Sequence, residues 1–193
     1  MVETRNLSQY IEIHAAGKRY HDGRISNHKL LAPWVFLRRP RSILDYGSGK
    51  NRMVERFIAP GASIRHRFDP AVPEIATIPL PRYDLILNTD VLEHLDEDEI
   101  GTVLADIHSH CKDALFLVDT RQAKTILPNG ENAHATVRPA EWWLGRIGEL
   151  FPDAELITVS SGKAYIRTWK ASSLSKAVAP VLGMGLRAAY SPK

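Results

Sequence analysis

The stretch Ser42–Phe57 reads SILDYGSGKNRMVERF and passes from one local pattern to another twice. A run of strand-forming residues ends at Asp45, two glycines follow at Gly47 and Gly49, and a helical pattern begins near Lys50. A glycine-containing turn between a strand and a helix brings main-chain N–H groups and a helix N-terminus close to a ligand. We therefore expect this loop to hold a ligand, and its chemical nature is the first question that the sequence raises.

The composition is that of a folded chain with one hydrophobic core. The chain has 193 residues, of which 44% are hydrophobic and 24% charged, as in ordinary globular proteins. Its single cysteine, Cys111, excludes an internal disulfide and fits a reducing compartment. No apolar run reaches the roughly 18–20 residues of a bilayer span, and the first residues lack the apolar region of a signal peptide. We expect a cytoplasmic protein with no transmembrane segment.

The positive charge is small and spread along the chain. The formal net charge is +3 and the pI is about 9.0, with local density only at 38–41 and 65–67. Nucleic-acid binders usually carry a stronger basic stripe with interleaved aromatic residues. We therefore predict a solvated basic face and no nucleic-acid partner, and keep an anionic substrate or a membrane surface as the other interpretation.

Strand and helix patterns alternate along most of the chain. Strands are expected at 42–45, 63–70, 83–90 and 113–120, helices at 50–58, 96–111 and 138–151, a hairpin at 154–170, and a short edge strand near 75–78. This alternation predicts one α/β domain with a mostly parallel sheet, to which the hairpin adds an antiparallel strand. We divide the chain into an N-terminal helical lid (1–39), a core (40–170) and a C-terminal tail (171–193), either docked as a helix or mobile.

The glycine loop does not match the usual phosphate cradles. A Walker loop needs Gly-Lys-Ser/Thr after a longer spacer, and a dinucleotide loop needs a third glycine where Arg52 stands. A carboxylate at Asp45 would also repel a pyrophosphate. The same carboxylate favours a ligand with an ammonium and a sulfonium, such as S-adenosylmethionine. Asp69, at the end of the next strand, is placed for ribose hydroxyls.

Three motifs together resemble one enzyme family. ILDYGSGKN (43–51) resembles the glycine-rich motif of class I, Rossmann-like S-adenosylmethionine-dependent methyltransferases, RFDP (67–70) is similar to their acidic second motif, and YDLILNTDVLEHL (83–95) resembles their fourth. The resemblance covers roughly residues 40–170. It implies a mostly parallel sheet of the seven-strand type with a C-terminal antiparallel hairpin strand, helices on both faces, and S-adenosylmethionine as cofactor.

The resemblance also implies which residues meet the cofactor and the acceptor. The expected cofactor-binding residues are Asp45, Tyr46, Gly47, Ser48, Gly49, Asp69, Pro70, Asn88, Thr89 and Asp90. Loops after the fourth and fifth strands cover the acceptor in this fold, and the expected substrate-binding residues are Glu93, Trp142 and, from the lid, Tyr20.

Two histidines are the candidate catalytic bases. His134 and His94 have side chains that titrate near neutral pH, which suits removal of a hydroxyl proton during methyl transfer. The alternative for both is a structural histidine that bonds to the main chain. Glu93 and His94 with the nearby acids of DEDE (96–99) would be the candidate metal ligands, but we expect no metal requirement.

The function that we predict is methylation of a small molecule, sugar or lipid-linked glycan, by O-methylation. The alternatives are an RNA or protein methyltransferase and a non-catalytic binding or scaffold protein of the same fold. A nicotinamide-dependent oxidoreductase is disfavoured by Arg52 and Asp45.

Overall fold

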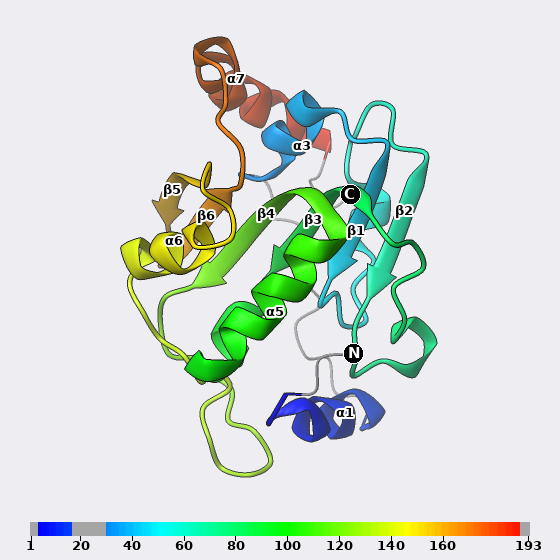
Figure 1. The fold of residues 1–193 in the computed structure, drawn as a ribbon, viewed down its shortest axis with the longest axis vertical. Coiled ribbons are helices and arrows are strands. Elements are labelled where there is room, and N and C mark those ends of the chain that lie inside the picture. The colour runs from blue at the N-terminus through cyan, green and yellow to red at the C-terminus, as the bar shows by residue number, and fades with distance from the viewer. Residues whose placement is uncertain (1–3, 17–29, 190–193) are drawn as a thin grey trace.

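The structure is a computed structural model of the chain and describes residues 4–16 and 30–189. Its centre is a six-stranded sheet with the order β2-β1-β3-β4-β6-β5 (Figure 1). The strands are β1 (Ser42–Tyr46), β2 (Ile64–Phe68), β3 (Tyr83–Thr89), β4 (Cys111–Asp119), β5 (Glu155–Ser160) and β6 (Lys163–Arg167). Neighbours among β1 to β4 are parallel, β6 is antiparallel to β4, and β5 is antiparallel to β6. The predicted α/β class and the hairpin strand are confirmed.

The predicted edge strand near 75–78 is wrong. A 3₁₀ helix, η1 (Pro73–Ile75), occupies the first part of this segment, and the following residues are irregular. Four prolines lie at positions 70, 73, 79 and 81, and proline has no N–H to donate to a sheet ladder. The described sheet therefore has six strands, and β2 forms its edge.

The described helices are α1 (Leu7–Ala15), α3 (Ala32–Arg38), α4 (Met53–Arg56), α5 (Glu97–His110), α6 (Ala140–Gly148) and α7 (Ser173–Ala189), with a 3₁₀ turn η2 (Leu92–His94). Of the three helices with predicted bounds, those at 96–111 and 138–151 lie close to α5 and α6. The helix after the glycine loop is the exception, because α4 is much shorter than the predicted 50–58. Asp96 caps α5 in a capping box with Glu99, as its place before an acidic first turn predicted.

Alternate residues of the central strands serve two separate cores. In β3, Leu85 and Leu87 pack in one core with α3, α4 and α7, whereas Ile86 packs in the other with α5 and α6. Both faces of a parallel sheet are buried in this way, which explains the nearly continuous apolar runs of β3 and β4. The helices accordingly cover both faces of the sheet, as predicted.

The C-terminal segment docks as a helix. α7 lies beside α3 at one end of the molecule (Figure 1), and Ala179 is buried in the shared core. The outer side of α7 carries exposed apolar side chains at Leu174, Val181 and Met184. Within the described part of the chain, no helix has both the length and the apolar character needed to cross a membrane.

Replacing Trp143 should destabilise the fold far more than replacing its neighbour Trp142. Trp143 is completely buried between α6 and the sheet, whereas Trp142 is only partly buried. We expect Trp143→Ala to lower the free energy of unfolding by about 3–5 kcal/mol, and Trp142→Ala by about 1–2 kcal/mol. Urea unfolding of both variants measures the difference. Equal losses would contradict the placement of Trp143 in the core.

Candidate functional site

The predicted site residues gather where the parallel strands end. β1, β2, β3 and β4 all point the same way, so their carboxyl ends share one edge of the sheet. From β1 the chain continues to β2 on one side of this strand and then returns to β3 on its other side. Open α/β sheets bind ligands at such a switch point. Figure 1 shows α1 beyond the carboxyl ends of β1 and β2.

The glycine loop after β1 needs both of its glycines. Gly47 has φ 81°, and a Cβ built there would lie 2.4 Å from Cγ2 of Val91. Gly49 has φ 53°. Side chains are strained at such positive φ values, and at Gly47 there is also no room for one. The loop can therefore run tightly between the ends of β2 and β3.

The main chain of this loop is bonded to the end of β2. The N–H groups of Gly47 and Ser48 donate to the carbonyl of Phe68, at 2.8 and 3.1 Å. The N–H of Gly49 donates to Oδ2 of Asp69 at 2.7 Å. The sequence led us to expect that N–H groups of this loop lie close to a ligand. These three already have acceptors, so they hold the loop rather than a ligand.

Asp45 lies at the end of β1 with a carboxylate that has no bonded partner. Its exposed fraction is 1%, and neither carboxylate oxygen has a hydrogen-bond partner among the described residues. Burial, and after it the nearby carboxylate of Asp69, raise the pKa of Asp45 to about 7, although Arg67 acts in the opposite direction. A buried polar group without a partner is costly, so this carboxylate is placed to accept hydrogen bonds from a ligand.

Asp69 follows β2 and braces two segments of main chain. Its Oδ1 accepts from the N–H of Ala71 at 2.8 Å, and its Oδ2 accepts from Gly49. Burial raises the pKa of Asp69, and these two bonds oppose the rise. A carboxylate has about four acceptor positions, so two remain for hydroxyl groups such as those of a ribose.

The other residues predicted for the cofactor have mixed placements. The Tyr46 hydroxyl donates to Asp106 of α5 at 2.7 Å, so its side chain is turned away from the loop. The Asn88 amide donates to the Tyr46 carbonyl at 3.1 Å, on the sheet face opposite to Asp45. Ser48 is buried and bonds within the loop, and Pro70 stands in the chain between Asp69 and Ala71, which are joined by a hydrogen bond.

A charged cluster follows the ends of β3 and β4. Asp90 forms an ion pair with Lys163 of β6, whose amine also lies 3.8 Å from Asp119. Asp90 has φ 55°, and its N–H donates to the Leu117 carbonyl at 2.8 Å. Its carboxylate is therefore held by β6. Thr89, before it, is only partly buried. These contacts make Asp90 part of the wall of the site.

Glu93 in η2 is completely buried beside this cluster. Its Oε1 accepts from the N–H of Asp119 at 2.9 Å, and its Oε2 has no partner among the described residues. Burial raises its pKa well above the ordinary value, the charge of Asp90 raises it further, and Lys163 opposes this.

The structure brings both predicted catalytic histidines to Glu93. Ligand-type atoms of Glu93, His94 and His134 all lie within 4.8 Å of one another. The two imidazole rings are 5.0 Å apart, edge to face. Nδ1 of His94 lies 2.7 Å from the Ala133 carbonyl, and Nδ1 of His134 lies 2.5 Å from the Arg121 carbonyl. We call these three residues the histidine cluster.

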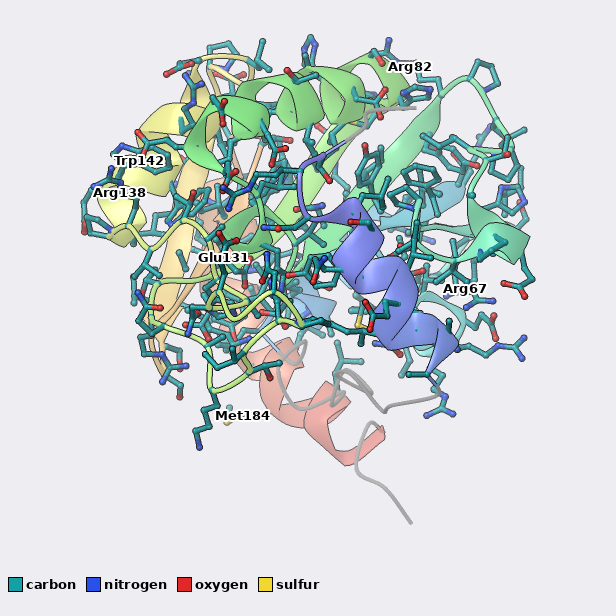
Figure 2. The ribbon with its side chains drawn as sticks, turned by 90° about the horizontal axis from the view of Figure 1, so that it is seen from below. Arg67, Arg82, Glu131, Arg138, Trp142 and Met184 are labelled. Atoms are coloured by element: carbon teal, nitrogen blue, oxygen red, sulfur yellow. The ribbon has the colours of Figure 1, made fainter. Side chains whose placement is uncertain are left out.

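Trp142, which was predicted to contact the acceptor, packs against its neighbours on α6. Trp142 packs edge to face on Trp143, and the Arg138 guanidinium lies over its ring. Figure 2 shows Trp142 and Arg138 together at the outer rim of α6. Tyr20 lies outside the described residues. Two acids of DEDE (96–99), named above as candidate metal ligands, have other partners. Asp96 caps α5 and forms an ion pair with Arg5, and Glu97 forms one with Arg138.

α1 contributes residues that the sequence analysis did not single out. His14 is buried against the glycine loop, and its carbonyl accepts from Lys50 at 2.6 Å. The Tyr10 hydroxyl lies 3.0 Å from Nδ1 of His94 and 3.1 Å from the Ala133 carbonyl. α1 therefore contacts both the loop and the histidine cluster. Lys163 and Asp119 were missed too, although Asp119 ends a predicted strand, as Asp45 does.

Comparisons with known proteins find likeness in structure only. No protein-family model matches the chain, and no curated protein matches its sequence. Solved methyltransferase structures do match. DhpI bound to S-adenosylhomocysteine is 15% identical with a TM-score of 0.58, over 83% of this chain and 93% of that one.

Two further solved structures are methyltransferases whose names give their acceptors. A 1,6-didemethyltoxoflavin-N1-methyltransferase from Burkholderia thailandensis, solved with S-adenosylhomocysteine, is 17% identical with a TM-score of 0.55, over 83% of this chain and 84% of that one. The mitomycin 7-O-methyltransferase MmcR is 12% identical with a TM-score of 0.61, over 83% of this chain and 59% of that one. The chain has the Rossmann-like fold of these methyltransferases.

Asp45→Asn should stabilise the ligand-free protein at alkaline pH. The folded carboxyl has a pKa of about 7 against 3.8 unfolded, so the folded state binds its proton more tightly. Its contribution to stability is full below pH 3.8 and is lost as pH rises through 7. At pH 8 the asparagine should recover at most roughly 4 kcal/mol, and below pH 4 little.

Thermal unfolding of both proteins across pH 4–8 measures this gain. Asp153→Asn, at an exposed position, is the matched control and should change the pH profile little. An Asp45→Asn protein that is less stable than the parent at pH 8 would contradict the unpartnered state of Asp45.

Proposed function

We propose that this protein is an S-adenosylmethionine-dependent methyltransferase that methylates a hydroxyl group of a small-molecule acceptor. The observation that carries the proposal is the Asp45 carboxylate, which is buried at the switch point of a methyltransferase-type sheet with both oxygens unbonded by the described residues. A cationic donor of hydrogen bonds is the ligand that such a carboxylate favours.

The residues around the loop fit the parts of this cofactor. Asp45 offers two acceptors for an ammonium group, and its negative charge favours a nearby sulfonium. Asp69 keeps acceptor positions for the ribose hydroxyls while it braces Gly49. When bound, S-adenosylmethionine would supply a methyl group on a sulfonium to an acceptor oxygen in line, and S-adenosylhomocysteine would be the leaving group. The carboxylates of Asp45 and Asp69, at the carboxyl ends of the neighbouring strands β1 and β2, support this cofactor over a dinucleotide.

The histidine cluster supports a hydroxyl acceptor. A hydroxyl oxygen becomes a good nucleophile only as it loses its proton, and a neighbouring imidazole or carboxylate can accept that proton. Glu93, His94 and His134 supply such groups beside the ends of β3 and β4. Catalysis would otherwise rest on positioning of the two reactants. The carboxylates of Asp90 and Asp119 beside this cluster disfavour a polyanionic acceptor such as RNA.

The contacts of α1 support its role as a lid. Lys50 bonds to the carbonyl of His14 at one end of the helix, and Tyr10 contacts His94 near its middle. Arg5, just before the helix, pairs with Glu131 of the loop that leads to His134. A helix held over both halves of the site would exclude water from the reaction.

Calorimetric titration with S-adenosylhomocysteine tests the proposal. We expect micromolar binding by the parent protein and at least tenfold weaker binding by Asp69→Ala, because the ribose hydroxyls lose their acceptor. Asp69→Asn keeps one acceptor for the main chain and should fall between the two. NADH should show no binding.

Asp84→Ala is the matched control. Asp84 also accepts from main-chain N–H groups, those of Arg41 and Ser42, but at the amino end of β1. It should leave the affinity unchanged. If the parent protein unfolds cooperatively but does not bind S-adenosylhomocysteine, the proposed cofactor is wrong and a non-catalytic binding protein is favoured. Equal weakening by Asp84→Ala would show only a loss of fold.

A further inference from the structure

The histidine cluster combines a buried carboxylate with two imidazoles on separate segments. Glu93 and His94 lie in η2, and His134 lies in the loop between β4 and α6. Two bonds from Thr136 join the segments, because its N–H donates to the Glu93 carbonyl at 3.1 Å and its hydroxyl donates to the Leu95 carbonyl at 2.7 Å. The three side chains are therefore brought together by fixed main chain rather than by chance contact of mobile groups.

Both imidazoles are oriented by main-chain carbonyls. A carbonyl only accepts, so the short contacts of Nδ1 with the Ala133 and Arg121 carbonyls mean that each Nδ1 carries the proton. In the neutral ring, Nε2 is then the nitrogen with a lone pair. Histidines that bind a metal typically donate their other ring N–H to a carbonyl or carboxylate in this way.

The carboxylate of Glu93 supplies the second, independent observation. Its Oε2 is completely buried and has no hydrogen-bond partner among the described residues, although Oε1 is bonded to the N–H of Asp119. A fully buried acceptor without a donor is rare in folded proteins. A cation satisfies it without any further donor.

We propose that Glu93, His94 and His134 bind one divalent transition-metal ion, such as Zn²⁺, Mn²⁺ or Co²⁺. Two imidazoles and one carboxylate form a ligand set used by catalytic zinc and non-haem iron sites, and it leaves coordination positions open. The ligand-type atoms lie within 4.8 Å of one another, and atoms around a tetrahedral zinc lie about 3.4 Å apart. Side-chain shifts of about 1 Å therefore complete the site.

This inference changes the expected role of the two histidines. As ligands, His94 and His134 would not take the acceptor proton themselves. An ion beside the acceptor hydroxyl lowers the pKa of that hydroxyl, and the proton leaves to water. This role in catalysis rests on the proposed function, whereas binding of the ion does not.

Cobalt titration of the tag-free, full-length protein tests the site directly. The protein is first dialysed against a chelator and then titrated with Co²⁺, whose visible absorption reports coordination by protein nitrogen and oxygen. We expect one Co²⁺ per chain with micromolar affinity, displaced by stoichiometric Zn²⁺. Millimolar Mg²⁺ should not displace it, because Mg²⁺ prefers oxygen ligands.

Three single variants and one control locate the ion. Glu93→Gln, His94→Ala and His134→Ala should each weaken Co²⁺ binding at least tenfold and change the absorption spectrum. His108→Ala removes an exposed histidine of α5 and should change neither. Thermal unfolding identifies any variant that fails to fold, and Glu93→Gln, which is close in shape to the parent, then carries the test.

The outcomes separate this proposal from the proposed function. No stoichiometric binding, or binding that persists in folded Glu93→Gln and His134→Ala proteins, would overturn the metal site. S-adenosylhomocysteine binding, measured on the same samples without metal, reports on the cofactor site alone. Retained S-adenosylhomocysteine binding with no metal binding would leave the histidines as the proton acceptors.

Discussion

The arrangement of the site depends on a negative charge that the fold buries and leaves uncompensated. At the end of β1 the chain turns sharply through Gly47, and this turn places the Asp45 carboxylate beneath the loop, away from water. Asp69 cannot relieve it, because that side chain is itself acidic and is engaged with the main chain of Gly49 and Ala71. The carboxylate costs free energy in the empty protein and stabilises a cationic ligand when one binds.

Most of the sheet could be predicted from the sequence because its strands are buried on both faces. Continuous apolar runs such as those of β3 and β4 leave few other structures open, and polar turns mark their ends. Prediction was poorer at 70–82, where four prolines exclude a strand but do not specify what replaces it. The local sequence pattern also failed to predict how short α4 is, because the helix ends where Phe57 becomes extended and packs in the core.

The sequence could predict those site residues that lie at the carboxyl ends of strands. Asp45, Asp69 and Asp90 could be placed on one edge because parallel strands end together. The approach of His134 to Glu93 could not be foreseen, since it depends on a loop whose path is fixed by bonds such as those of Thr136. The part played by α1 was equally hidden, because no pattern in residues 7–15 indicates which surface the helix covers.

Among the described residues no strand lies beyond β2, which leaves an edge that a second molecule could pair with. Exposed edge strands promote aggregation unless charge or twist blocks the approach. β2 carries Arg65, His66 and Arg67 in succession, and the two arginines bond to carbonyls of the neighbouring segment around α4, among them those of Val54 and Asn51. The basic run that the sequence presents as a solvated patch thus lies on the open edge of the sheet, where its charge opposes pairing with the strand of a second molecule.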